Sequence, residues 1–259
     1  MTKYKFKDFF LPKLLLLLFL IIAFGLWEFF ARNGSINLFL FSSPSNIWKD
    51  IVVLFSTGEI WPHIYATLYA SFTGLLLGTV GGVIVAFIFG NIKILAKIFD
   101  PIFVGLNGLP KLALGPLFII WFGIGINAKV LMAAIMVFFL VFFNAYAGFR
   151  NVDVNLTNTL KLMGANRFQI IMKLTLPSCV PWIMASLRAG VGAAVLGAIV
   201  GEYLGATQGL GWMVQSAGGV YNITRVFSCI FILMILMSLL DYIVKRIEKS
   251  ILVWRPSAD

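Results

Sequence analysis

Long apolar runs separated by short polar segments dominate the chain. The run 64–90 contains no charged residue, and it exceeds the roughly 20 residues that a transmembrane helix needs. Further apolar runs that are long enough to span a bilayer lie at 14–31, 101–126, 130–149, 180–204 and 226–244. The pattern predicts an all-helical integral membrane protein with about six transmembrane helices, organised as a single membrane domain over residues 1–259.

Three segments depart from a plain apolar helix. The basic start of the chain and its first apolar run resemble a signal peptide, but no small-x-small cleavage site follows before Arg32, so we expect a retained first helix. Pro110, Pro116 and several glycines predict a kink in the run 101–126. The mixed polarity of 33–63 predicts a loop with a short amphipathic helix at the membrane interface.

The charge of the chain supports a membrane setting. Only 12% of the residues are charged, whereas a soluble domain has about 25%. The net charge of +10 is therefore better explained by a lipid surface than by nucleic acid, and we expect no nucleic-acid partner. With both termini in the cytoplasm, 14 basic residues lie inside, and the external connections hold Arg32, Lys49, Lys129 and Arg225. Because cytoplasmic loops retain Lys and Arg, this asymmetry predicts cytoplasmic termini.

Residues that carry catalytic or metal-binding chemistry are scarce. Cys179 and Cys229 lie in apolar surroundings, and His63 is the single histidine, expected in an external loop. This set excludes a disulfide scaffold, a Cys/His zinc cluster and a histidine-dependent catalytic site, so we expect buried thiols, no metal and no catalytic residue. No phosphate-binding loop is present, so we also expect no nucleotide site in this chain.

The segment 150–177 is the longest polar interruption between apolar runs. Its pattern predicts a helix over 155–163, a left-handed turn at Gly164, and a second helix over 168–176 that ends before Pro177. Such a helix-glycine-helix hairpin suits docking to a partner protein. The pattern fits a simple amphipathic loop at the membrane interface equally well.

The same segment resembles the coupling loop of ABC importer permeases, in which a Glu-Ala-Ala triplet precedes a glycine and a closing Ile-x-Leu-Pro. Gly164 corresponds to the glycine, Leu174 to the isoleucine, and Leu176 and Pro177 to the closing pair. Ala165, next to the glycine, is expected to take part in the contact with the ATPase as well. In place of the triplet, this chain has Asn158, Thr159 and Leu160. The absent glutamate removes any salt bridge that it would make, but not the hairpin.

Other segments resemble permeases of the nitrate/sulfonate/taurine group, namely 109–125, 141–153, 186–214 and 246–256. The resemblance implies a type I ABC importer permease fold in the bacterial cytoplasmic (inner) membrane. It also implies a small anionic solute, a second permease copy, two cytoplasmic ATPase subunits that bind ATP and Mg, and an external binding protein or lipoprotein. Residues 158–164 would contact the ATPases. The chain itself would bind no cofactor and would not be an enzyme.

Charged residues inside predicted spans are candidates for the solute pathway, because charge at membrane depth is costly. Lys111 and Arg188 lie roughly midway through their spans and would attract an anionic group. Alternatively, they pair with Glu202 or Asp100, or bind backbone carbonyls that the Pro110 kink exposes. Glu202 itself fits either an external gate or a hydrogen-bonded helix end.

Two further patterns have packing and functional interpretations. Small residues spaced four apart predict tight helix packing within one bundle, with a dimer face as the alternative; they are Gly74, Gly78, Gly82, Gly197, Gly201 and Gly205. A run of aromatic residues predicts packing or lipid contact rather than a surface for an aromatic solute; it comprises Phe138, Phe139, Phe142 and Phe143.

Two rival functions fit a polytopic membrane protein. A self-contained secondary carrier or channel would work without an ATPase, but a proton-driven carrier needs acids or histidines in mid-span, and these are scarce here. An intramembrane enzyme would need a catalytic dyad, and the predicted spans contain no paired carboxylates.

Overall fold

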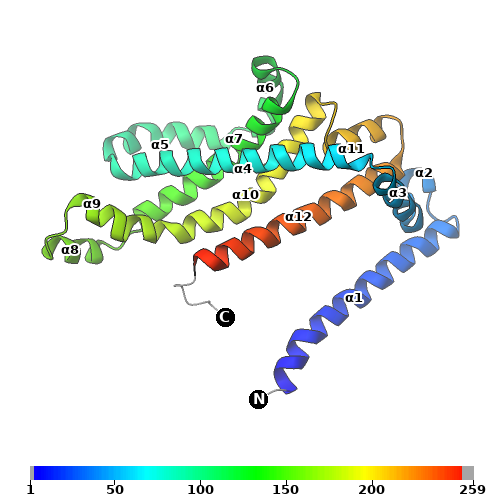
Figure 1. The fold of residues 1–259 in the computed structure, drawn as a ribbon, viewed down its shortest axis with the longest axis horizontal. Coiled ribbons are helices and arrows are strands. Elements are labelled where there is room, and N and C mark those ends of the chain that lie inside the picture. Colours follow the sequence, from blue (N-terminus) through cyan, green and yellow to red (C-terminus); the bar gives the residue numbers. More distant parts are fainter. Residues whose placement is uncertain (1–2, 253–259) are drawn as a thin grey trace. The chain divides into compact units, whose positions relative to one another are not determined.

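A computed structural model describes residues 3–252, and side chains from residue 11 onward apart from that of Lys93. Within this range all regular structure is helical (Figure 1). The helices are α1 (Lys3–Arg32), α2 (Leu38–Phe41), α3 (Pro44–Ser56), α4 (Ile60–Asn91), α5 (Lys93–Gly108), α6 (Gly115–Phe122), α7 (Ile126–Arg150), α8 (Val154–Leu162), α9 (Arg167–Ile170), α10 (Leu176–Gly205), α11 (Leu210–Gly219) and α12 (Ile223–Ile251). The end of the segment 246–256, with Arg255, lies outside the described residues.

Five helical segments are long and apolar enough to cross a membrane, and a bent pair raises the number to six. The five are Leu11–Arg32, Ile60–Asn91, Ile126–Arg150, Arg167–Gly205 and Ile223–Ile251. The bent pair joins Ile94–Gly108 to Lys111–Phe122 at an angle of 88°. The prediction of about six spans is confirmed.

The predicted span 101–126 differs from the observed elements. Helix α5 begins at Lys93, and the chain breaks into two helices at Leu109 and Pro110 instead of bending within one. Leu109 is extended, with φ −66° and ψ 138°. Because proline disfavours the helical region for the residue before it and has no N–H to donate, the helix ends here.

The described chain divides into two compact units, and the expectation of a single domain stays a prediction. One unit contains the residues up to Trp61 together with Met213–Ile232. Within it, the Arg225 guanidinium contacts the carboxylates of Asp50 at 3.0 Å and Glu59 at 2.9 Å. These ion pairs join the start of α12 to α3 and to the turn after it.

The other unit contains Pro62–Trp212 and the residues from Leu233 onward, and its core is built around α7. Small and β-branched side chains of α4, α7 and α10 meet there, namely Ala70, Val130, Ala133, Val137, Val141, Ala194 and Ala198. A Cβ on Gly78 of α4 would lie 2.7 Å from the Val137 Cβ. The prediction of tight packing within one bundle is thus confirmed for the glycines of α4 and α10 that face α7.

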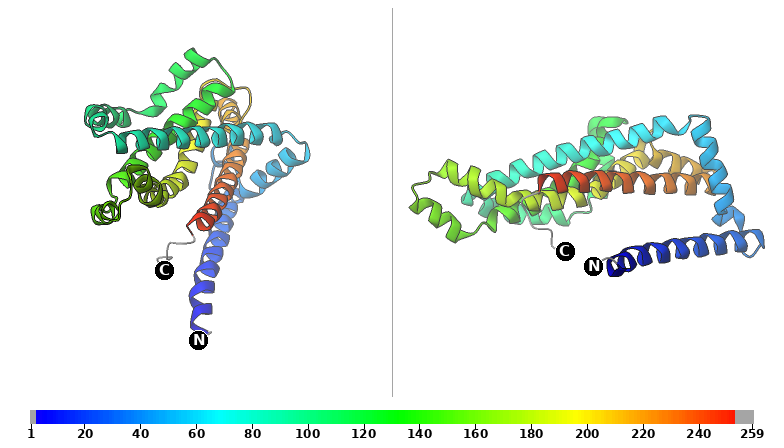
Figure 2. Two further views of the ribbon diagram at one scale, coloured as in Figure 1. Left: turned by 60° about the vertical axis from the view of Figure 1, so that its left-hand side comes forward. Right: turned by 60° about the horizontal axis from the view of Figure 1, so that its bottom comes forward.

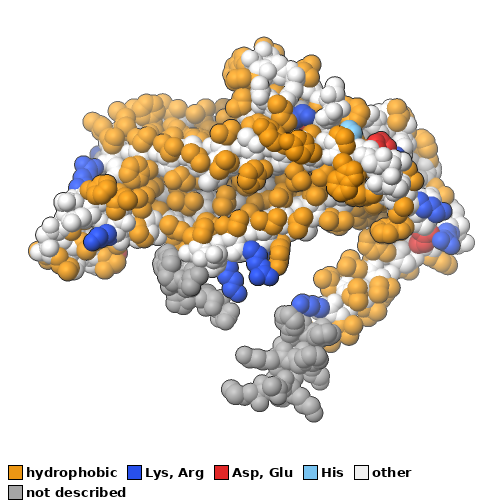
Figure 3. Space-filling view, viewed as in Figure 1, with side chains coloured by type: hydrophobic (Ala, Val, Ile, Leu, Met, Phe, Trp, Pro, Cys, Tyr) orange, Lys and Arg blue, Asp and Glu red, His pale blue; other side chains and the backbone are white. Residues whose placement is uncertain are grey.

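The aromatic run of α7 is also a packing feature. The Phe142 ring lies 4.6 Å from that of Phe103 and 5.7 Å from that of Phe89, measured between centroids. Phe139 and Phe142 are buried, and so are Cys179 and Cys229. Hydrophobic side chains cover most of the face shown in Figure 3, while Lys and Arg gather toward helix ends. This distribution matches helices surrounded by hydrocarbon.

Candidate functional site

The polar segment after α7 forms the predicted hairpin. Asp153 caps α8 by accepting a hydrogen bond from the Asn155 amide at 2.7 Å. After α8, Gly164 has a φ of +82°, and the Ala165 amide donates to the Leu160 carbonyl at 2.9 Å, which closes the helix end. The predicted helix and left-handed turn are therefore confirmed. Figures 1 and 2 show this hairpin projecting beyond the ends of α4 and α7.

The second arm of the hairpin does not end before Pro177, so that part of the prediction is wrong. The arm begins at α9, whose first residues are held by reciprocal hydrogen bonds of 2.8 Å between Asn166 and Gln169. It then passes through a π-helical turn at Ile171–Thr175 directly into α10. Pro177 has no N–H to donate, and in an α-helix its ring would clash with a carbonyl of the preceding turn. The wider π-helical turn makes room for the ring, so the helix continues. The arm is consequently a continuous extension of a membrane span.

The structure places the predicted coupling residues in two groups. Asn158, Thr159 and Gly164 are exposed at the hairpin, with Leu160 and Ala165 half-buried beside them. Leu176 and Pro177 lie instead on the second arm, where α10 begins. The Arg167 guanidinium donates to the Asn91 carbonyl at 3.1 Å and so ties the hairpin to the end of α4.

Sequence reasoning missed the apolar character of the hairpin tip. Leu162, Met163 and Phe168 are 89%, 76% and 69% exposed. Large apolar side chains beside a glycine in an otherwise polar segment are a signal that would have identified them. Large exposed apolar side chains on a short projecting segment are typical of a surface that contacts another molecule.

A buried polar cluster surrounds Glu202 near the end of α10. One Glu202 carboxylate oxygen accepts from the Thr67 hydroxyl at 2.8 Å, and the other accepts from the Gly211 amide at 2.7 Å. The Leu210 amide donates to the Thr67 hydroxyl at 2.8 Å. Glu202 is fully buried, and its bonds fasten the turn after α10 to α4. This geometry is the hydrogen-bonded helix end, and a role in a gate stays a prediction.

Two residues of this cluster are expected in external connections, and the structure places both inside helices instead, while the side of the membrane on which they lie stays a prediction. His63 lies inside α4, buried, with its ring stacked on that of Trp212 at 5.3 Å and its Nδ1 accepting from the Gly209 amide at 3.1 Å. Lys129 lies in the first turns of α7 and donates to the Gln208 carbonyl at 2.5 Å. The spans extend beyond their apolar runs because buried partners satisfy these polar side chains.

Lys111 lies at the break between α5 and α6 and is half-buried. Its Nζ donates to the carbonyl oxygen and to the side-chain oxygen of Asn107, both at 3.0 Å, and lies 5.1 Å from the centre of the Phe139 ring. The structure thus matches the interpretation in which Lys111 binds a carbonyl exposed by the Pro110 kink.

Arg188 has a different partner from those expected. It forms an ion pair with Glu248 of α12, and not with Glu202 or Asp100. Arg188 is exposed, and the role of either cation in a solute pathway stays a prediction. Within the described residues, no three His, Cys, Asp or Glu side chains lie together as a metal ion requires.

Comparisons with known proteins identify the family. The model of the family described as "Binding-protein-dependent transport system inner membrane component" matches residues 78–253. The Bacillus subtilis protein SsuC, whose name refers to aliphatic sulfonates transport, is 32% identical over 236 residues, which cover 91% of this chain and 86% of SsuC. The formylaminopyrimidine transport permease protein ThiX of Halalkalibacterium halodurans is 33% identical, over 92% of this chain and 94% of ThiX.

A further relative and a solved structure are also similar to this chain. The taurine transport system permease protein TauC of Escherichia coli is 28% identical over 91% of this chain and 87% of TauC. A chain of the MetNI methionine ABC transporter, solved in an inward-facing crystal form, superposes with a TM-score of 0.65 at 21% identity, over 75% of this chain and 98% of that chain. At this identity the superposition shows a shared type I ABC importer permease fold. The chain therefore belongs to the binding-protein-dependent transport system inner membrane component family, and it is a multi-pass permease of a bacterial ABC importer.

Proposed function

We propose that this permease forms half of a homodimeric solute pathway, with both termini in the cytoplasm and an ATPase subunit docked on each α8–α9 hairpin. ATP and Mg bind to the ATPases, and an external binding protein or lipoprotein delivers the solute. The exposed apolar tip formed by Leu162, Met163 and Phe168 carries this proposal, because Phe168 lies on the arm that continues without interruption into α10, and Leu162 and Met163 lie just before the Gly164 turn that joins α8 to this arm. Closed twofold symmetry is the commonest arrangement of two copies.

The shape of the hairpin supports a mechanical role. Closure of the ATPases moves a span only if the contact and its connection to the membrane are stiff. The Gly164 turn, the Asn166 capping box and the Arg167 contact with α4 each fix one part of that connection. ATP and the loaded binding protein would then favour an outward-open state, and hydrolysis would reverse the preference, because a ligand shifts an equilibrium by its differential affinity for the two states.

The subunit composition tests this proposal directly. The chain is purified from its native membrane in a mild detergent, and every co-purifying subunit is identified and counted by mass spectrometry. We expect ATPase copies in equal number to permease copies, with two of each per complex. A chain that purifies alone and transports in vesicles without ATP would overturn the proposal and favour a secondary carrier or channel.

The solute we propose is a small anion such as a sulfonate, taurine or nitrate. Support comes from relatives whose names refer to aliphatic sulfonates and taurine, and from Lys111 and Arg188, the cations expected within the spans. Lys111 is the better placed, because it lies at the break between α5 and α6 and no carboxylate of the described residues pairs with it. Arg188 is already paired with Glu248.

Lys111→Ala is expected to weaken uptake of an anionic solute about tenfold, because a charge-assisted contact contributes roughly 1.5–3 kcal/mol. Uptake of radiolabelled taurine and of an alkanesulfonate is measured in vesicles with the partner subunits, together with the amount of assembled complex. Asn107→Ala, which removes a partner of Lys111 but keeps its charge, is the control and retains uptake. Equal losses of complex and uptake in Lys111→Ala would show a structural role instead.

Glu202 is proposed as part of an external gate, since its carboxylate holds the turn after α10 against α4. Thr67→Val and Glu202→Gln are each expected to lower uptake about tenfold while the complex still assembles. Thr67→Val removes the hydroxyl that donates to the carboxylate, and Glu202→Gln replaces one of the two accepting oxygens by an amide nitrogen that cannot accept. Thr79→Val is the control on the same helix, because the Thr79 hydroxyl has no partner in the structure. Complex loss in proportion to uptake would show that the cluster is only a helix end.

A further inference from the structure

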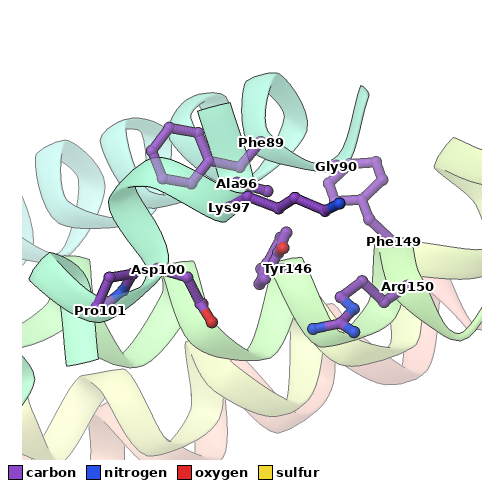
Figure 4. Close-up of a pocket in the computed structure, with 9 residues that line it drawn as sticks. All are labelled: Phe89, Gly90, Ala96, Lys97, Asp100, Pro101, Tyr146, Phe149 and Arg150. Atoms are coloured by element: carbon purple, nitrogen blue, oxygen red, sulfur yellow. The ribbon is translucent and has the colours of Figure 1, made fainter. Parts of the chain in front are cut away.

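A cavity of about 630 Å³ opens between the end of α4, the start of α5 and the end of α7 (Figure 4). It lies at the same end of the helices as the α8–α9 hairpin. Phe89, Phe149 and Tyr146 form its aromatic wall, and Lys97, Asp100 and Arg150 supply charged groups. No residue of the proposed pathway or gate lines it, so the function described above leaves this cavity unexplained.

The charges of the cavity favour an anion. Lys97 and Arg150 form no ion pair with any carboxylate of the described residues, and the guanidinium of Arg150 lies 5.7 Å from the centre of the Tyr146 ring. In Figure 4 the charged end of Lys97 lies beside Gly90 and Phe149, and that of Arg150 points toward the middle of the cavity, whereas Asp100 lies toward the Pro101 side. Two cations and one carboxylate leave a net charge of +1, which a singly charged phosphodiester would neutralise.

The surface next to the cavity is apolar. Ile94, Ile98 and Ile102 follow one another at successive turns of α5, and they are 68%, 56% and 51% exposed. The same helix supplies Lys97 and Asp100 to the cavity. An amphiphile with an anionic head and long hydrocarbon chains matches both features, whereas a soluble anion would use only the cavity.

We propose that this cavity binds the phosphodiester headgroup of an anionic phospholipid, with Lys97 and Arg150 contacting the phosphate and the acyl chains lying along the isoleucines of α5. The hydroxyl of Tyr146 would donate a further hydrogen bond to the phosphate. The charge asymmetry of the loops predicts that this end faces the cytoplasm, so the lipid would come from the inner leaflet. The proposal requires only a membrane-embedded chain, not the solute or the coupling mechanism proposed above.

The test counts bound lipid by native mass spectrometry of the complete complex, released from nanodiscs of phosphatidylcholine with or without phosphatidylglycerol. We expect phosphatidylglycerol to remain on the wild-type protein, and the Lys97→Gln/Arg150→Gln variant to retain it about tenfold less. Arg246→Gln/Lys249→Gln removes the same charge from exposed positions that do not line the cavity, and it retains the lipid. Equal retention by both double variants would overturn the proposal.

A second experiment distinguishes a bound lipid from a bound free anion. Inorganic phosphate is titrated against the complex in pure phosphatidylcholine nanodiscs, and thermal stability is recorded. We expect no shift below millimolar phosphate, because only a lipid adds the contacts along α5. A shift that disappears in Lys97→Gln/Arg150→Gln, without phosphatidylglycerol retention, would assign the cavity to a soluble anion and overturn the lipid proposal. Because neither readout involves uptake or ATP hydrolysis, failure here is distinguishable from failure of the proposed coupling.

Discussion

Gly164→Val is expected to lower ATP-driven uptake at least about tenfold while leaving the transporter assembled, because left-handed backbone costs a β-branched residue roughly 1–3 kcal/mol. Gly164 has a φ of +82°, and a Cβ placed on it would meet no atom within 4 Å. The effect would therefore come from backbone strain and not from a clash. The strained turn would relax by reorienting α8 against α9, which changes the surface offered to the ATPase.

The measurement compares uptake, ATP hydrolysis and co-purified ATPase for the same preparation. Gly164→Asn is the matched control, because asparagine tolerates the left-handed region better than other non-glycine residues, and most of the uptake is expected to remain. Uptake by Gly164→Val at the wild-type rate would contradict the hairpin mechanism. Loss of ATPase binding together with uptake would show that the turn determines the affinity for the ATPase, and not the coupling of ATP hydrolysis to uptake.

Gly197→Leu is expected to reduce the folded permease in the membrane to about a tenth or less, since overpacking a close helix contact costs roughly 1–3 kcal/mol or more. A Cβ on Gly197 would lie 2.7 Å from the Ala133 Cα and 2.8 Å from the Met132 carbonyl oxygen, both backbone atoms of α7. Backbone atoms cannot move away by changing rotamer, as a side chain can, so α7 and α10 would have to separate along the core of the bundle.

Gly192→Leu provides the control on the same helix. A Cβ there would meet only the terminal methyl of Met237 at 3.7 Å, which is the flexible end of a side chain. Folded protein is quantified by fluorescence-detected size exclusion in mild detergent, and we expect the Gly192 variant to remain near the wild-type amount. Similar amounts of the two variants would mean that folding does not depend on the close contact between α7 and α10 at Gly197.

Several features of the hairpin and of the spans were predictable from local sequence. The left-handed turn at Gly164 follows from a glycine between two amphipathic stretches, and the helix over 155–163 was predicted within one residue of α8 at each end. The number of spans follows from runs longer than the bilayer is thick. Close packing followed from glycines spaced four apart, because that spacing places them on one helix face.

The partners of the polar residues were not predictable, because they lie far apart in the chain. Glu202 bonds to Thr67, 135 residues away, and Arg188 pairs with Glu248, 60 residues away. Local sequence predicts loops at His63 and Lys129, because it cannot show that each side chain has a buried hydrogen-bond partner elsewhere in the chain. Similarly, Pro177 predicted a helix end, yet a π-helical turn before it lets the helix continue.

The sequence by itself therefore determined the class of this protein: a bundle of membrane helices with one structured hairpin, which is encoded in short-range patterns of polarity, glycine and proline. Only the tertiary structure decided which charges are buried, which are paired and which face an open cavity. Hydrophobic length and turn chemistry act over a few neighbouring residues. Hydrogen bonds and ion pairs inside a bundle depend on which faces of distant helices meet, and packing alone sets that choice.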